Sequence, residues 1–141
     1  MKRILITGKN SYVGNSFEKW LEQFPSNEYK IDKISVRNET WKECDFSPYD
    51  VILHVAGIAH RRETKDNKEL YYRVNRDLTY ELAIKAKAEG VRHFIFLSSM
   101  SVYGVANGTI SKTTEPKPRS NYGKSKLEAE KLINSISSDN F

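Results

Sequence analysis

Residues 2–14 read KRILITGKNSYVG, and this stretch decides the fold class. The apolar run at residues 3–6 ends at Thr7-Gly8, which is typical of a buried strand followed by a turn. A helix is expected over residues 15–24, which carry apolar residues at helical spacing. Between strand and helix, Gly8 would permit the tight turn, and Gly14 would permit a close approach of the helix to the strand. Free N–H groups and the positive end of the dipole lie at a helix N-terminus, so this turn predicts a phosphate-binding position. Taken alone, a turn with two glycines is equally compatible with an ordinary loop.

The rest of the chain alternates between strand and helix patterns. Leu70, Val74, Leu78 and Leu82 recur every fourth residue, and Gly90 follows as a C-terminal cap of this longest helix. Strands that are apolar throughout, separated by amphipathic helices, predict a doubly wound parallel sheet of the α/β class, covered on both faces. Further strands are expected over residues 29–36, 40–45, 50–55 and 91–97, and helices over residues 67–89 and 121–137.

Length and composition narrow the class of protein. A chain of 141 residues with 38% hydrophobic residues, a net charge of +5 and one cysteine favours a single domain over residues 1–141 without an internal disulfide. The start of the chain lacks the apolar run of a signal peptide, and the longest apolar stretch, at residues 51–59, is too short to span a bilayer. We therefore expect a cytoplasmic protein without a membrane partner. No nucleic-acid-binding motif or metal-ligand spacing is present, so neither nucleic acid nor a metal is expected.

A second motif is Tyr122-Gly123-Lys124-Ser125-Lys126, in which Tyr122 and Lys126 share one helix face. A phenol has a pKa near ~10 and is a poor base at neutral pH, but a neighbouring ammonium favours the phenolate. Tyr122 could then take a proton from a substrate hydroxyl while a hydride leaves the same carbon. The alternative is a chance pair on a surface helix.

The third motif, at residues 97–104, places Ser99 directly after an expected strand. Ligands of doubly wound sheets bind beyond the carboxyl ends of the strands, so this hydroxyl could hold a substrate oxygen beside Tyr122. The alternative is a serine-rich turn. The order of the three motifs, each on a suitable element, favours the functional interpretation over the separate alternatives.

With these motifs the chain resembles the extended short-chain dehydrogenase/reductase family, the NAD(P)-dependent nucleotide-sugar epimerases and dehydratases. Residues 94–99 (FIFLSS), 101–104 (SVYG) and 122–127 (YGKSKL) are most similar to UDP-sugar 4-epimerases. The resemblance implies a Rossmann-type NAD(P)-binding domain that ends before the substrate-binding region of the family. It also implies a nucleotide-sugar substrate and, by analogy with the family, a homodimer.

The same resemblance implies residue roles. Tyr122 matches the catalytic base, Lys126 the lysine that contacts the nicotinamide ribose, and Ser99 the catalytic hydroxyl. The other matches belong to cofactor binding: the pyrophosphate loop (Gly8, Ser11, Tyr12, Val13 and Gly14), the adenine contacts (Asp45 and Phe46), the strand end against the cofactor (Val55, Ala56 and Gly57) and the asparagine of the long helix (Asn75).

Departures from the family pattern refine these expectations. Ser11 stands where a glycine is usual. Arg37 follows the second strand, and no acidic residue is available there for ribose hydroxyls. Arg37 is instead placed for a 2′-phosphate, which weakly favours NADP over NAD. The alternative for Arg37 is an exposed loop arginine. Met100 and Ser101 replace the acid pair of sugar 4,6-dehydratases, so elimination of water is not expected.

Three functions stay open from the sequence. The first is a nucleotide-sugar 4-epimerase that moves a C4 hydride through a keto intermediate. The second is a one-way keto-sugar reductase, and the third is an NAD(P)-binding sensor without turnover. Residues 60–62 (HRR) could face a diphosphate, although a solvated loop is the favoured interpretation.

Overall fold

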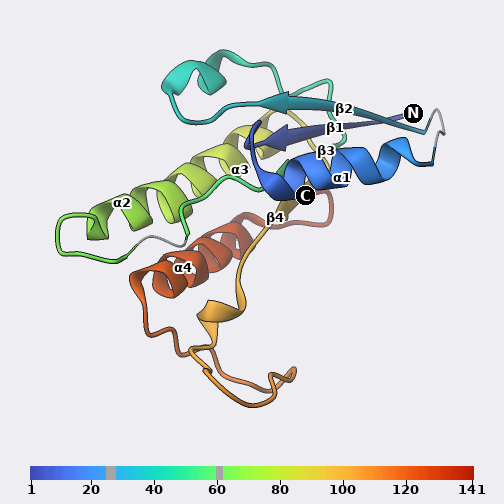
Figure 1. Cartoon of the computed structure of the whole chain (residues 1–141). Coiled ribbons are helices and arrows are strands. Elements are labelled where there is room, and N and C mark those ends of the chain that lie inside the picture. Colours follow the sequence, from blue (N-terminus) through green and yellow to red (C-terminus); the bar gives the residue numbers. More distant parts are fainter. Residues whose placement is uncertain (25–27, 60–61) are drawn as a thin grey trace. The chain divides into compact units, whose positions relative to one another are not determined.

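The computed structural model describes residues 1–24, 28–59 and 62–141 (Figure 1). They form two compact units. Unit 1 lies within residues 1–56, 82–97 and 137–141, and unit 2 within residues 57–81 and 98–136. The expected single domain over residues 1–141 stays a prediction.

Unit 1 contains a parallel sheet of four strands in the order β2-β1-β3-β4 (Figure 1). Ile4, Leu5 and Ile6 of the inner strand β1 are all buried. Successive side chains of a strand point to opposite faces, so both faces of β1 are covered. This confirms the doubly wound parallel sheet. The strands are β1 (Lys2–Thr7), β2 (Tyr29–Ile34), β3 (Val51–His54) and β4 (His93–Phe96).

Helix α1 (Tyr12–Glu22) follows β1 after the predicted turn. It begins three residues before the predicted position because Ser11 is its N-cap: the Ser11 hydroxyl accepts the Gly14 N–H at 2.8 Å. A Cβ added at Gly14 would lie 2.9 Å from the Ile6 Cγ2, so a larger residue would push the helix from the strand. The close helix–strand approach predicted for Gly14 is therefore confirmed.

The strand predicted over residues 40–45 is wrong. The segment forms a 3-10 helix, η1 (Glu39–Glu43), closed by a hydrogen bond from the Cys44 N–H to the Trp41 carbonyl. Thr40 and Trp41 favour strands, but Trp41 turns into the core, and the next N–H groups find no strand partner. The Phe46 N–H instead donates to the Glu89 carboxylate at 2.5 Å.

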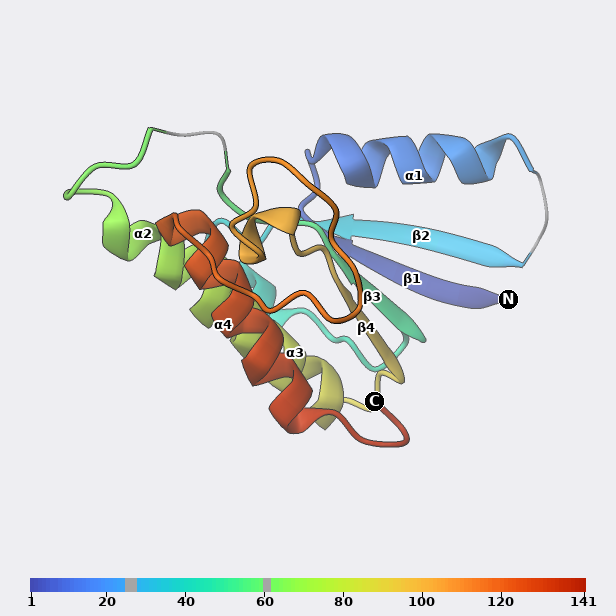
Figure 2. The same cartoon turned by 90° about the horizontal axis from the view of Figure 1, so that it is seen from below.

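The long predicted helix is present, with an unpredicted π-helical turn inside it. It runs as α2 (Lys68–Tyr72), the π-helix η2 (Arg73–Asp77) and α3 (Leu78–Ala88), and Gly90 follows with a φ of +81°. Within unit 2, α2 and η2 pack along α4 (Asn121–Ile136), and the 3-10 helix η3 (Met100–Val102) contacts α4 as well (Figure 2).

Candidate active site

Tyr122 and Lys126 lie one turn apart on α4, in unit 2. Tyr122 is half-buried, whereas Lys126 is only 5% exposed. Burial lowers the pKa of Lys126 from an ordinary 10.5 to about 8, and the charge of Glu130 acts in the opposite direction. Such a lysine keeps its ammonium at neutral pH but is close to losing it, which suits a group that influences a neighbouring phenol.

Gly57 lies beside both the Asn75 amide and the Lys126 ammonium. A Cβ added at Gly57 would be 3.0 Å from Asn75 Oδ1 and 3.4 Å from Lys126 Nζ. The segment after β3, the π-helix and α4 thus bring together three residues that the sequence assigned to cofactor binding. Any side chain at position 57 would fill the space between the amide and the ammonium.

The fully buried Asn75 amide fixes this arrangement. Its Oδ1 accepts the Ile58 N–H at 2.9 Å, and its Nδ2 donates to the Ile58 carbonyl at 3.0 Å. Nδ2 also lies 3.3 Å from the Ser125 hydroxyl on α4. The Asn75 side chain of the π-helix therefore pairs with the Ile58 backbone and also contacts α4. π-Helical turns are frequent at functional sites.

Ser99 is the N-cap of η3, and its hydroxyl accepts the Ser101 N–H at 3.1 Å. The turn packs against the start of α4, because a Cβ at Gly123 would lie 2.5 Å from the Ser101 carbonyl oxygen. Ser99 and Tyr122 thus belong to elements in direct contact, and the convergence of their hydroxyl groups on a substrate stays a prediction.

One residue that sequence analysis missed is Glu63. Its Oε1 accepts the Tyr122 N–H at 2.9 Å, and its Oε2 accepts both the N–H and the Nδ2 of Asn121 at 3.0 Å. Burial disfavours its charged form, but these donors outweigh that effect, so the pKa of Glu63 lies below its usual range. The carboxylate caps the positive end of α4 from 58 residues upstream, a separation at which no local capping pattern is visible.

Unit 1 contains the predicted phosphate loop. Gly8 has a φ of +121°, and a Cβ there would lie 3.0 Å from the Ala56 nitrogen and 3.1 Å from the Val55 Cγ2. Gly8 is thus required both by its backbone conformation and by its neighbours. Three further residues of the predicted cofactor site are thereby brought together.

The first turn of α1 in unit 1 lies at the predicted diphosphate position. Ser11 directs its hydroxyl at the Gly14 N–H, and Tyr12 and Val13 are exposed, Tyr12 by 86%. The first N–H groups of a helix have no acceptor within the helix, so those at the exposed start of α1 can serve an anion.

Arg37, Asp45 and Phe46 differ in their surroundings. Arg37 and Asp45 are exposed, and hydrogen bonds from Ser47 lower the pKa of the Asp45 carboxyl. Phe46 is fully buried, and Lys85 Nζ lies 5.0 Å from its ring centroid. The contacts of these residues with adenine or a 2′-phosphate stay predictions. Of residues 60–62, His60 and Arg61 lie outside the described residues, and Arg62 is exposed.

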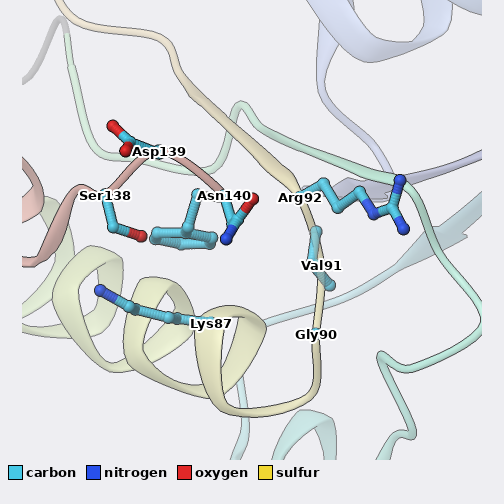
Figure 3. A pocket seen from close by; sticks show the side chains of 8 residues that line it. Lys87, Gly90, Val91, Arg92, Ser138, Asp139 and Asn140 are labelled. Carbon is cyan, nitrogen blue, oxygen red and sulfur yellow. The ribbon is translucent and has the colours of Figure 1, made fainter.

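Unit 1 also has a cavity of about 600 Å³ near residues 87–92 and 138–141 (Figure 3). Lys87 Nζ lies 5.8 Å from the Phe141 ring centroid along its wall. None of the predicted site residues lines this cavity, so it forms no part of the candidate site.

Comparison with known proteins identifies the family. The model of the NAD dependent epimerase/dehydratase family matches residues 4–140. The chain belongs to this family. In the described part of this member, no helix has both the length and the apolar character needed to cross a bilayer.

The relatives include several 4-epimerases. The UDP-glucose 4-epimerase of Vibrio cholerae is 32% identical over 160 residues, which cover 98% of this chain and 48% of that protein. The N-acetyl-alpha-D-glucosaminyl-diphospho-ditrans,octacis-undecaprenol 4-epimerase of Escherichia coli O157:H7 is 28% identical over 92% of this chain and 42% of that protein. The chain thus spans about half the length of the curated relatives it matches.

Solved structures agree with the fold. The UDP-glucuronic acid 4-epimerase of Bacillus cereus in complex with NAD superposes with a TM-score of 0.78 and 25% identity, over 94% of this chain and 52% of that one. The UDP-Glc/GlcNAc 4-epimerase of Campylobacter jejuni gives a TM-score of 0.75 and 26% identity, over 96% and 49% of the two chains. The Rossmann-type fold of the family is therefore confirmed.

Proposed function

We propose that this chain forms the NAD(P)-binding part of a nucleotide-sugar 4-epimerase. The observation that carries the proposal is the buried Lys126 ammonium one turn from Tyr122, beside Gly57 and Asn75. An ammonium in this position favours the phenolate form of a neighbouring tyrosine, and lysines are rarely buried as deeply as Lys126. Membership of the NAD dependent epimerase/dehydratase family and the two 4-epimerase relatives support the same reaction class.

NAD(P), when bound, accepts a hydride from the sugar carbon and returns it. The residues of this chain fit such a group, because Gly8 and the exposed start of α1 leave backbone N–H groups for a diphosphate. Lys126 would hold the ribose hydroxyl groups through its ammonium. Arg37, whose guanidinium is exposed, would select NADP over NAD by contacting a 2′-phosphate.

Three side chains would perform the proton chemistry. Lys126 favours the phenolate form of Tyr122 before the transfer. Tyr122 then takes the proton of the C4 hydroxyl and becomes a neutral phenol, while Ser99 donates a hydrogen bond to the C4 oxygen. After the keto-sugar turns, Tyr122 returns the proton to the same oxygen. Ser99 can serve in both directions because a hydroxyl is donor and acceptor.

The test is inversion at C4. The whole protein that contains this chain is incubated with UDP-glucose and either NAD⁺ or NADP⁺, and the anomeric signals of the two UDP-hexoses are followed by NMR. Inversion that Tyr122→Phe abolishes supports the 4-epimerase. Reduced sugar formed at the expense of NADPH supports the keto-sugar reductase, and cofactor binding without conversion of any UDP-sugar supports the sensor. A homodimer, proposed from the family, is tested separately by light scattering.

A further inference from the structure

A hydroxyl–carboxylate pair in unit 2 has no part in the chemistry proposed above. The Ser98 hydroxyl donates a hydrogen bond to Glu130 Oε1, across 32 residues of sequence. Both side chains are half-buried. The bond ties the segment after β4 to the third turn of α4 and fixes the direction in which the Glu130 carboxylate points.

Glu130 follows Lys126 by four residues on α4, so the two side chains share a helix face. Lys126 is 5% exposed, and burial disfavours its ammonium. The negative charge of Glu130 acts against that burial and favours the ammonium. A carboxylate one turn away is thus placed to keep the buried lysine charged.

Other charged groups near the helix have donors of their own. Glu63 accepts three N–H donors at the start of α4, and Glu128 pairs with Arg76 at 2.7 Å. The residues beside Lys126 from the loop and the π-helix, Gly57 and Asn75, are uncharged. Glu130 accepts from the neutral Ser98 hydroxyl, which orients the carboxylate without cancelling its charge.

We propose that Glu130, oriented by the Ser98 hydroxyl, is a positioning residue that keeps the Lys126 side chain charged within unit 2. The inference rests on the proposed function, because the proposed function gives the Lys126 charge its role. That role is to favour the Tyr122 phenolate and to hold the ribose. Ser98 thereby has a role distinct from that of Ser99, although the two serines are adjacent. Loss of the Glu130 charge would leave Lys126 neutral over more of the physiological pH range.

The experiment measures the titration of Lys126 itself. Lysine side chains of the whole chain are isotope-labelled at Cε, and their signals are followed by NMR from neutral to strongly alkaline pH. Lys126→Met identifies the Lys126 signal by its absence. We expect Glu130→Gln to lower the pKa of Lys126 by roughly one pH unit. Ser98→Ala should lower it by less, because the carboxylate keeps its charge but loses its orientation.

The matched control is Glu128→Gln, which removes a carboxylate from the same helix and should leave the Lys126 titration unchanged. An unchanged pKa in Glu130→Gln, or an equal shift in Glu128→Gln, overturns the proposal. If Glu130→Gln does not fold, Ser98→Ala decides, and a wild-type titration in that variant overturns it.

Binding of NADH and of NADPH to the unmodified chain is measured beside the titration. A Lys126 titration that shifts in Glu130→Gln, without binding of either dinucleotide to the unmodified chain, contradicts the proposed function while the electrostatic relationship holds. Binding of either dinucleotide, with a Lys126 titration that does not shift in Glu130→Gln, contradicts this inference and leaves the proposed function in place.

Discussion

Gly123, in the first turn of α4, lies against the Ser101 carbonyl so closely that a Cβ at position 123 would be 2.5 Å from that oxygen. Real Cβ atoms do not approach backbone oxygens to this distance, so the contact between η3 and α4 depends on the missing side chain. The same contact holds the turn of Ser99 against the helix of Tyr122 within unit 2.

Gly123→Ala is therefore expected to destabilise the protein although alanine favours helices. Overpacking of a close contact lowers the free energy of unfolding by roughly 1–3 kcal/mol. Urea denaturation measures the change. Lys124→Ala, at the exposed neighbouring position, is the control and should stay within about 0.5 kcal/mol of wild type. Equal stability of the two variants would show that the backbone contact is not tight.

Asn75→Ala should leave the backbone N–H and carbonyl of Ile58 without the hydrogen-bond partners that the Asn75 amide supplies. Their donor and acceptor lose the amide that pairs with them at 2.9 and 3.0 Å, so we expect the free energy of unfolding to fall by roughly 1–3 kcal/mol. At a pH where its carboxyl is neutral, Asn75→Asp keeps an acceptor for the Ile58 N–H and has an O–H donor for the Ile58 carbonyl, so it should destabilise less than alanine. Wild-type stability of Asn75→Ala would contradict this interpretation of the π-helix.

Lys126→Met should stabilise the protein at neutral pH, because a buried ammonium opposes folding. The folded-state pKa is lowered from 10.5 to about 8, so the destabilisation is complete below pH 8 and is lost as the pH rises towards 10.5. The difference in pKa corresponds to on the order of 3 kcal/mol at neutral pH. Urea denaturation across this pH range measures it, with Lys124→Met as the exposed control. A stability difference that does not diminish with rising pH would contradict the assigned burial effect.

Glu63→Gln tests the cap of α4. The pKa of Glu63 is lowered in the folded state, so its contribution to stability is present above the ordinary carboxyl pKa and is lost as acid protonates the group. We expect wild type to be more stable than Glu63→Gln by roughly 1 kcal/mol at neutral pH, and the difference to disappear in acid. Chemical denaturation at several pH values measures it. Glu69→Gln, exposed in the helix that follows, should show no such difference.

Local patterns predicted much of unit 1. The apolar run before Gly8 and the spacing to Gly14 sufficed for β1, the turn and α1, because each signal lies within a few residues of its consequence. The strand expected over residues 40–45 failed for the opposite reason. A strand needs a partner, and the Phe46 N–H has the Glu89 side chain as its acceptor, 43 residues away.

In the candidate site, too, local features were predicted and long-range contacts were not. The Tyr122 and Lys126 spacing follows from the helix alone, whereas the roles of Glu63 and Glu130 depend on contacts across 58 and 32 residues. The π-helical turn around Asn75 was also not predicted, and the hydrogen bonds of its Asn75 side chain reach the Ile58 backbone, 17 residues away in the sequence.

The central claim is that this chain binds a dinucleotide, with Lys126 as a ligand of the ribose. Isothermal titration of the chain with NAD⁺, NADH, NADP⁺ and NADPH tests it most directly, beside Lys126→Met and the exposed control Lys124→Met. We predict saturable binding of at least one of these dinucleotides, weakened roughly tenfold or more in Lys126→Met and unchanged in Lys124→Met. Absence of binding to all of them, or equal binding by Lys126→Met, would contradict the account.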